Sequence, residues 1–441
     1  MFSYYLQLGL RRCRRSPAIV ALVVLTMAIG IAACMTALAI FGALEGQPLP
    51  GVSNHLYVVT MDARETADKS GSANIYDSPD SLLKLRDAKA LVDAHHAPVQ
   101  VALTHTYAQV GNPNGRQTDA VTGLLAYGPV LQELGVPLRF GRPWTQAEQA
   151  SHAPVAVIDG KLAEKLFGIA DAVGRSVRIQ QHRFQVIGVT APWKPRTAFI
   201  GAANFGGQVV GSDLQLFVPV GAALDAGMGP ETSGECGGSA TDMTFGSVDV
   251  QHCRWLEVWV ALKTPAAMAS YQRFLAGYAD AQHAAGRFVH PPQAKLYGTR
   301  AWMALNNVIP DDVSLNLILA GAFLVLCMIN VAGLLTARFL RRQTDVAIRR
   351  ALGASWRQVF AQHLVESGLL GLMGGLLALP LTLLGMWIVR KQPVGYAPAA
   401  HFSPGVFVGL LVLSLVVGMI VGILPAWRVC RLPPAIQIKQ A

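Results

Sequence analysis

The sequence is poor in charged residues, which fill 14% of its 441 positions, whereas about a quarter is usual for a soluble protein. Hydrophobic residues fill 52% of the positions. Four long apolar runs account for this imbalance, at roughly 18–43, 315–337, 369–389 and 406–426. Each run approaches the ~20 residues that an α-helix needs to cross a bilayer. We therefore predict a membrane protein with four transmembrane helices.

Acidic residues are also scarce, with 26 of them against 36 lysines and arginines. Thirteen basic residues lie next to the spans in the N-terminal segment, the segment between spans two and three, and the C-terminal segment, whereas the short loop between spans three and four has only Arg390 and Lys391. Because basic residues concentrate on the cytoplasmic side, both termini are predicted to be cytoplasmic and residues 46–310 to lie outside the membrane. Since these residues flank spans and form no separate basic domain, a nucleic-acid partner is not predicted. The thirteen are Arg11, Arg12, Arg14, Arg15, Arg338, Arg341, Arg342, Arg349, Arg350, Arg357, Arg428, Arg431 and Lys439.

The first apolar run is longer than the apolar core of a cleavable signal peptide, about 7–15 residues. We expect a retained anchor, although Ala37-Leu38-Ala39 resembles a cleavage site. Of the six cysteines, only Cys236 and Cys253 fall in the external block. An oxidising compartment would allow them to form a disulfide, and two free thiols are the alternative.

Motifs for chemistry are absent from the sequence. It has no phosphate-binding G-x-x-x-x-G-K-[ST] motif and no zinc-binding H-E-x-x-H motif. The histidines His95, His96 and His105 lack a metal-ligand spacing, and His363 and Glu366 are interpreted as interfacial residues just before span three. We therefore expect no catalytic residue, no metal site and no cofactor bound by this chain.

The external block alternates between strand-like and helix-like segments, which predicts an α+β domain, with two subdomains. We expect a helix at 78–88 capped by Ser78, a strand, turn and helix at 153–168, and a hairpin at 173–190. A strand at 254–263 should place Trp255 and Trp259 on one face, and a helix should span 267–282. The glycine-rich stretch at about 199–250 is interpreted as a mobile loop.

Glycines recur in the last two spans at a spacing of four residues. The pairs are Gly371 with Gly375 and Gly418 with Gly422. Small residues at this spacing let helix backbones approach closely. Packing within the chain is favoured over a seam between two copies.

Residues 345–360, between spans two and three, are predicted to form an amphipathic helix. At 100° per residue, Ile348, Leu352, Trp356 and Val359 fall on one side, and Arg350 and Arg357 on the opposite side. A lipid anchor is the simplest interpretation, but it does not explain the adjacent small residues Gly353 and Ala354. Small residues would let a second protein come close.

This segment resembles a known family. "TDVAIRRALGASWRQVFAQHLVESGLLGLMGGLLAL" is similar to the cytoplasmic helix and third span of FtsX/MacB-type ABC transporter permeases, and "PVAVIDGKLAEKLFG" with "AVGRSVRIQQHRFQVIGV" is similar to the MacB-like periplasmic core domain. The family pattern E-[IV]-[AG]-[IVL]-R-[KR]-A-[LIV]-G-A is matched with Asp in place of Glu at its first position. The residues are Asp345, Val346, Ala347, Ile348, Arg349, Arg350, Ala351, Leu352, Gly353 and Ala354.

The resemblance implies a multi-pass protein of the bacterial inner membrane with three parts: residues 1–45 with span one, a periplasmic core domain at 46–310, and an FtsX-like domain at 311–441. It implies a dimer with itself or a related permease, and a helix at 345–360 that docks on a separate ATPase carrying ATP and Mg. A periplasmic adaptor and an outer-membrane channel are further implied partners. Pro48 and Pro50 depart from the long stalk of the family, because prolines there should end the first helix early.

The sequence leaves three functions open. The first is the permease subunit of an ABC exporter. The second is a signal relay that activates an extracytoplasmic partner without transport. The third is an anchored external binding domain with no ATPase.

Overall fold

The computed structural model describes residues 17–49, 51–63, 82–115, 117–193, 199–201, 214–231, 253–289, 293–309, 311–340, 348, 353, 355–392 and 404–431. The chain divides into two compact units. One combines Met1–Leu44 with Asp311–Ala441, and the other is Glu45–Pro310. We call them the membrane unit and the external unit.

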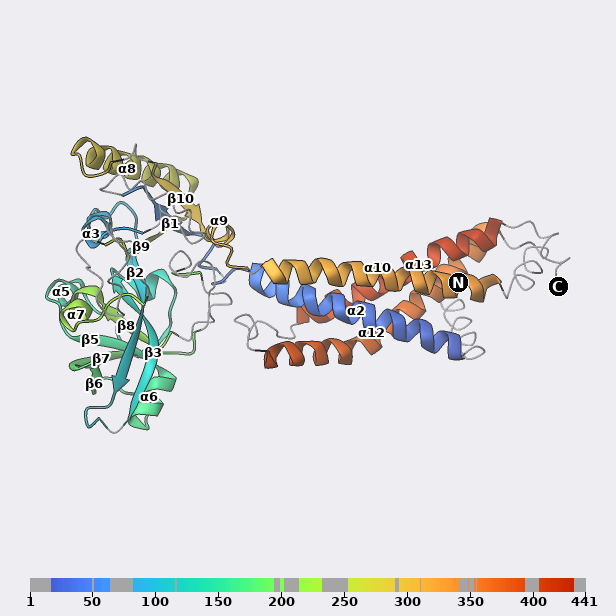
Figure 1. Ribbon diagram of the computed structural model, residues 1–441, viewed down its shortest axis with the longest axis horizontal. Helices are drawn as coiled ribbons and strands as arrows, with labels where there is room; N and C mark the ends of the chain where they lie inside the picture. Colours follow the sequence, from blue (N-terminus) through green and yellow to red (C-terminus); the bar gives the residue numbers. More distant parts are fainter. Residues whose placement is uncertain are drawn as a thin grey trace, which may run out of the picture. The chain divides into compact units, whose positions relative to one another are not determined.

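Among the residues that the structure describes, the membrane unit contains four helices that are long and apolar enough to cross a bilayer, which confirms the four predicted spans. Helix α13 packs closely along α12 and also along α10 (Figure 1). The first helix ends at Glu45, before Pro48, as the two prolines predicted. The helices are α2 (Pro17–Glu45), α10 (Asp311–Leu340), α12 (Trp356–Lys391) and α13 (Pro404–Arg431).

Within its described residues, the external unit is built on one mixed sheet of ten strands. Along the sheet the order is β10-β1-β9-β2-β3-β8-β5-β7-β4, with β6 pairing to β2 and β7. The pairs β3–β8 and β5–β7 are parallel, and the other pairs are antiparallel. The strands are β1 (Leu56–Thr60), β2 (Gln100–Gly111), β3 (Thr118–Tyr127), β4 (Leu138–Gly141), β5 (Val155–Asp159), β6 (Ser176–Ile179), β7 (His182–Thr190), β8 (Leu216–Pro219), β9 (Glu257–Ala261) and β10 (Lys295–Gly298).

Both faces of the sheet are buried at strands β1, β9, β8 and β5, because other parts of the unit cover each face there. Alternation along β9 sends Val258 and Val260 into one core and Trp259 into the other. Helices α3 (Leu85–Asp93), α6 (Gly160–Phe167), α7 (Val220–Asp225) and α8 (Pro265–Ala284) contribute to the first core. Helices α4 (Val130–Glu133) and α9 (Thr299–Leu305) contribute to the second.

Several elements form where the sequence predicts them, because residues within each element determine its structure. Strand β5 leads into α6, whose N-cap Asp159 accepts from the Leu162 amide at 2.7 Å and whose C-cap Gly168 has φ 70°. The glycine suits this end because a left-handed residue closes a helix at little cost. The predicted hairpin forms from β6 and β7, and the helix predicted at 267–282 is α8.

Four predictions for this unit are wrong. Residue 78 lies outside the described residues, and the helix expected there begins only at Leu85, because Leu83 forms a bridge with Leu256. Trp255 and Trp259 lie in different cores, since the amides of Trp255 and Leu256 both donate to the Leu83 carbonyl and interrupt the alternation. The two expected subdomains share one continuous sheet.

The fourth prediction, a mobile loop at 199–250, is wrong for the described residues 199–201 and 214–231. Strand β8 lies inside that range, in the middle of the sheet, and α7 follows it with most of its residues buried. Residues 199–201 are buried too. Phe199 contacts Trp259 edge to face, with ring centroids 5.2 Å apart.

Two side chains from neighbouring strands hold the peptide group between Ile200 and Gly201. Nε2 of His105 lies 3.0 Å from the Ile200 carbonyl, and the Gly201 amide donates to Glu257 Oε2 at 3.0 Å. Burial lowers the pKa of His105 to about 4, so the ring is neutral near pH 7. We call this arrangement the peptide clamp.

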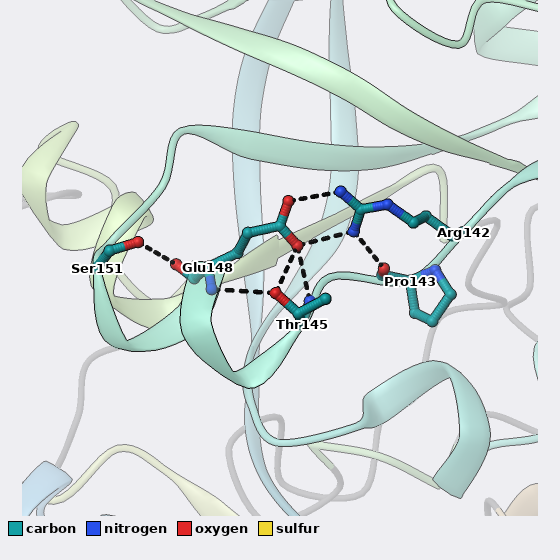
Figure 2. A network of polar contacts seen from close by, with 5 residues as sticks. All are labelled: Arg142, Pro143, Thr145, Glu148 and Ser151. Atoms are coloured by element: carbon teal, nitrogen blue, oxygen red, sulfur yellow. Dashed lines mark hydrogen bonds and ion pairs between the residues drawn. The ribbon is translucent and has the colours of Figure 1, made fainter.

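A polar corner follows β4 and begins the short helix α5 (Gln146–Ala150) (Figure 2). Arg142 makes two parallel bonds to the Glu148 carboxylate, at 2.7 and 2.8 Å, while Thr145 and Glu148 cap each other across the first turn. The Arg142 hydrogen bond, more than any other contact, lowers the pKa of Glu148 to about 2. Because this pair is solvent-exposed, it adds about 1 kcal/mol or less.

Candidate functional site

The prediction of one continuous docking helix at 345–360 is wrong, because the helix is interrupted at Gly353. Gly353 has φ +98°, which no helix residue adopts, and Ser355 is the extended N-cap of α12. Residues 356–360 therefore belong to the transmembrane helix α12, and only what precedes Gly353 can form a separate docking element. We call residues 341–355 the coupling segment.

Most of the proposed docking residues lie outside the described residues, namely Asp345, Ala347, Arg349, Arg350, Leu352 and Ala354. Ile348 is helical and 51% exposed. A Cβ added to Gly353 would meet no atom of the described residues within 4 Å, so backbone conformation explains the glycine. The sequence carried a signal for this break, since Ser355 and Gln358 form a capping box.

A buried ion pair lies beside the coupling segment. Nη2 of Arg338, near the end of α10, is 2.9 Å from Oε1 of Glu366 in α12, and both side chains are 2% exposed. The interpretation of Glu366 and His363 as interfacial residues concerns their depth in the membrane and stays a prediction, but both side chains are buried in the helix bundle. Opposite charges at the adjoining ends of two consecutive spans were the available sequence signal.

A second contact joins the same two helices. The rings of Phe339 and His363 have centroids 4.4 Å apart at an interplanar angle of 39°. One residue beyond Glu366, the Ser367 hydroxyl donates to the His363 carbonyl at 2.8 Å and faces Gly422 of α13. Polar and aromatic groups thus connect α10, α12 and α13 at one level.

The predicted glycine pairs lie at the contact of α12 with α13, within this chain. A Cβ on Gly371 would stand 2.8 Å from the Gly418 Cα, and one on Gly375 would stand 2.4 Å from the Ser414 hydroxyl. A Cβ on Gly422 would stand 2.1 Å from the Ser367 hydroxyl. These distances leave no room for a side chain, so the four glycines set the separation of the two helices.

The first span uses small residues in the same way, which the sequence pattern did not predict. A Cβ on Gly30 of α2 would be 3.0 Å from Cys327 Cβ of α10, and one on Gly374 of α12 would be 3.0 Å from Met27 Cβ. Gly30 and Gly374 belong to no repeating pattern in the sequence. Their role could not be predicted, because it depends on which helices pack against each other.

Cys253 is buried and disulfide-bonded, while Cys34 and Cys327 are free. Cys236 lies outside the described residues, so its pairing with Cys253 stays a prediction. In the described parts of the chain, no group of three or more His, Cys, Asp or Glu residues could hold a metal ion. His95 and His96 follow α3, whereas the buried His105 belongs to β2.

Comparison with known proteins gives two family matches. A model described as the MacB-like periplasmic core domain matches residues 20–276, and a model described as the FtsX-like permease C-terminal domain matches residues 317–434. The crystal structure of the periplasmic region of MacB from Actinobacillus actinomycetemcomitans aligns with a TM-score of 0.36 and 13% identity, over 57% of this chain and 92% of that one.

Two curated relatives cover much of the chain. The pyoverdine export ATP-binding/permease protein PvdT of Pseudomonas syringae pv. tomato is 24% identical over 423 residues, which are 94% of this chain and 56% of PvdT. The macrolide export ATP-binding/permease protein MacB of Pasteurella multocida is 23% identical over 304 residues, which are 68% of this chain and 40% of that protein. The chain spans about half the length of these relatives.

Proposed function

Because the chain belongs to the family of ABC transporter permeases with a MacB-like periplasmic core domain and an FtsX-like permease domain, we propose that it is the membrane subunit of an export system driven by a separate ATPase chain. The export direction follows the names of the relatives PvdT and MacB. In this proposal the ATPase carries ATP and Mg, and this chain moves its periplasmic domain.

The match over residues 317–434 carries the proposal, because it includes the coupling segment and the spans on both sides. The 441 residues contain no phosphate-binding motif, so the energy of ATP must enter from another polypeptide domain. The coupling segment supplies Arg341, Arg342, Arg349 and Arg350, whose positive charge would favour an acidic groove on the proposed ATPase. The charge distribution around the spans supports a cytoplasmic position for this segment and for both termini.

Further partners complete the proposed assembly. They are a second permease chain, identical or related, and a periplasmic adaptor with an outer-membrane channel. The signal relay is the competing function. Purification would separate the two, since an adaptor bound to the periplasmic domain supports export, whereas a cell-wall hydrolase bound there supports the relay.

The test is affinity purification of the full-length tagged chain from membranes of its own host, followed by mass spectrometry. We expect an ATPase with a phosphate-binding motif to co-purify. Arg350→Glu should lower its yield, more strongly at low salt because surface charges are then less screened. Arg390→Glu, on the opposite side of the membrane in this proposal, is the matched control and should leave the yield unchanged.

Two substitutions of Gly353 distinguish a loss of ATPase docking from an effect of backbone strain. Gly353→Ala and Gly353→Glu both force a side chain onto φ +98°, but only Glu adds negative charge and bulk to the segment. We expect Gly353→Ala to reduce ATPase yield partly and Gly353→Glu to abolish it, with membrane insertion intact. ATPase recovered with Gly353→Glu at wild-type yield would show that this segment is a lipid anchor.

A further inference from the structure

Helices α10 and α12 are joined by side chains more than by backbone contact. Among the residues that the structure describes, α13 packs closely on both helices, whereas α10 and α12 approach each other at few positions. The Arg338–Glu366 ion pair and the Phe339–His363 ring contact bridge the space between them. We call these two contacts the latch.

The latch lies where the coupling segment meets the bundle. Arg338 precedes the end of α10 by two residues, and the coupling segment starts at the next residue after Leu340. Glu366 and His363 lie within the first three turns of α12, which begins directly after the segment. The ends of α10 and α12 are thus joined twice: covalently through the coupling segment, and non-covalently through the latch.

Helices α10 and α12 are attached to different parts of the protein. Helix α10 begins at Asp311, immediately after the last residue of the external unit, so it connects that unit covalently to the coupling segment. Helix α12 is instead fixed to α13 through the glycine contacts at Gly371 and Gly418. A movement that enters through α12 can therefore reach α10 at this level through the latch.

A buried ion pair suits this task better than an apolar contact. Removing two charges from water is costly, and apolar side chains of similar volume often stabilise a fold as well or better. The planar guanidinium group of arginine, however, fixes direction as well as distance to a carboxylate. Such a pair resists both separation and sliding of the two helices, whereas an apolar contact resists sliding weakly.

We propose that Arg338 and Glu366 are positioning residues that transmit movement of the coupling segment to α10, and through it to the periplasmic domain. The inference rests on the proposed function, because it assumes that an ATPase moves the segment. Neither residue touches the ATPase in this scheme. Their loss should uncouple ATP hydrolysis while leaving ATPase binding intact.

The test compares Arg338→Gln, Glu366→Gln and the double variant Arg338→Gln/Glu366→Gln in the full-length complex. Each single variant leaves one buried charge without its ion-pair partner, so its melting temperature in detergent should fall. The double variant has two neutral amides that can hydrogen-bond, and its melting temperature should return toward the wild-type value. Arg390→Gln, an exposed arginine at the other end of α12, is the control and should change nothing.

The decisive measurement is ATP hydrolysis by the co-purifying ATPase in liposomes, with the chain present and absent. We expect the double variant to retain the ATPase at wild-type yield. The increase in ATP hydrolysis that the chain causes should be at least tenfold smaller with the double variant than with wild type. A purely structural pair would instead recover its stimulation together with its melting temperature. That recovery would overturn the proposal, as would a double variant that melts as early as the single ones.

The same measurements distinguish a failure of the proposed function from a failure of the latch proposal. If the wild-type chain brings down no ATPase, the proposed function fails and the latch proposal fails with it. If the ATPase binds and both wild type and double variant stimulate it equally, only the latch proposal fails.

Discussion

Two glutamates of the periplasmic domain have side-chain pKa values that their surroundings move in opposite directions. Arg142 holds Glu148 ionised, so the stability from this pair is present above the ordinary glutamate pKa and is lost as pH falls toward 2. Glu133 is 2% exposed, and neither carboxylate oxygen has a hydrogen-bond partner among the described residues. Burial raises its pKa to about 9.

Replacing Glu133 should therefore stabilise the protein. Near pH 7 the folded chain keeps Glu133 protonated while the unfolded chain releases the proton, so Glu133 disfavours folding increasingly as pH rises from about 4.5 to 9. We expect Glu133→Gln to raise the free energy of unfolding by about 3 kcal/mol at pH 7 and by much less at pH 5. The check is the melting temperature at both pH values.

Gln132→Glu provides the control for this prediction, because it places an acid at the exposed neighbouring position. Its melting temperature should match wild type at both pH values. A Glu133→Gln variant whose gain does not depend on pH would show that the carboxylate is not the source of the effect.

The disulfide is a second prediction at the residue scale. Cys253 is disulfide-bonded, and we expect Cys236 to be its partner, because both belong to the periplasmic block and flank a glycine-rich stretch. Closing that loop would add about 3 kcal/mol in the chain-entropy model. Mass spectrometry of unreduced peptides, from cells alkylated before lysis, should recover the linked pair. Recovery of Cys236 as an alkylated thiol would refute it.

At the scale of elements, the contact of α12 with α13 depends on the absence of side chains. Gly371→Ala would place a methyl group 2.5 Å from the Ser414 carbonyl oxygen, so we expect it to cost about 1–3 kcal/mol. A Cβ on Gly333 of α10 meets nothing within 4 Å among the described residues, so Gly333→Ala should instead gain up to about 1 kcal/mol from helix propensity. Thermal unfolding of the purified chain should show shifts of opposite sign, and equal shifts would contradict the assigned contact.

Elements whose causes are local could be predicted from the sequence. Strand β5, helix α6 and Gly168 follow one another with their own caps, and the four spans follow from apolar length alone. Strand β8 was missed because the sheet around it, contributed by distant β3 and β5, stabilises a segment surrounded by glycines. The Arg338–Glu366 pair was missed for the same reason, since only helix packing decides which charges meet.

The docking helix shows a different kind of error. Its apolar residues keep a helical period across the break at Gly353, so periodicity alone joined two elements. The capping box at Ser355 was visible in the sequence and contradicted that join. Cap signals should therefore outweigh periodicity where a glycine precedes them.

At the scale of the whole molecule, the prediction concerns orientation in the membrane. The charge count predicts that residue 75 is periplasmic and residue 345 cytoplasmic. We expect a membrane-impermeant maleimide to label Ile75→Cys in cells whose outer membrane has been permeabilised, and to label Asp345→Cys only after the inner membrane is broken. The reverse pattern would overturn the topology and the docking proposal together.

The peptide clamp at Ile200–Gly201 has a consequence for how this protein can be altered. The chain between Trp193 and Leu214 is held at Ile200–Gly201 by His105 and Glu257, so the stretches on either side are each tethered at both ends. Lengthening a tethered segment costs only a slowly growing closure entropy, and the cost stays within that segment. An epitope tag inserted near residue 206 should therefore leave the peptide clamp intact, and the sequences before and after the clamp can diverge in length independently during evolution.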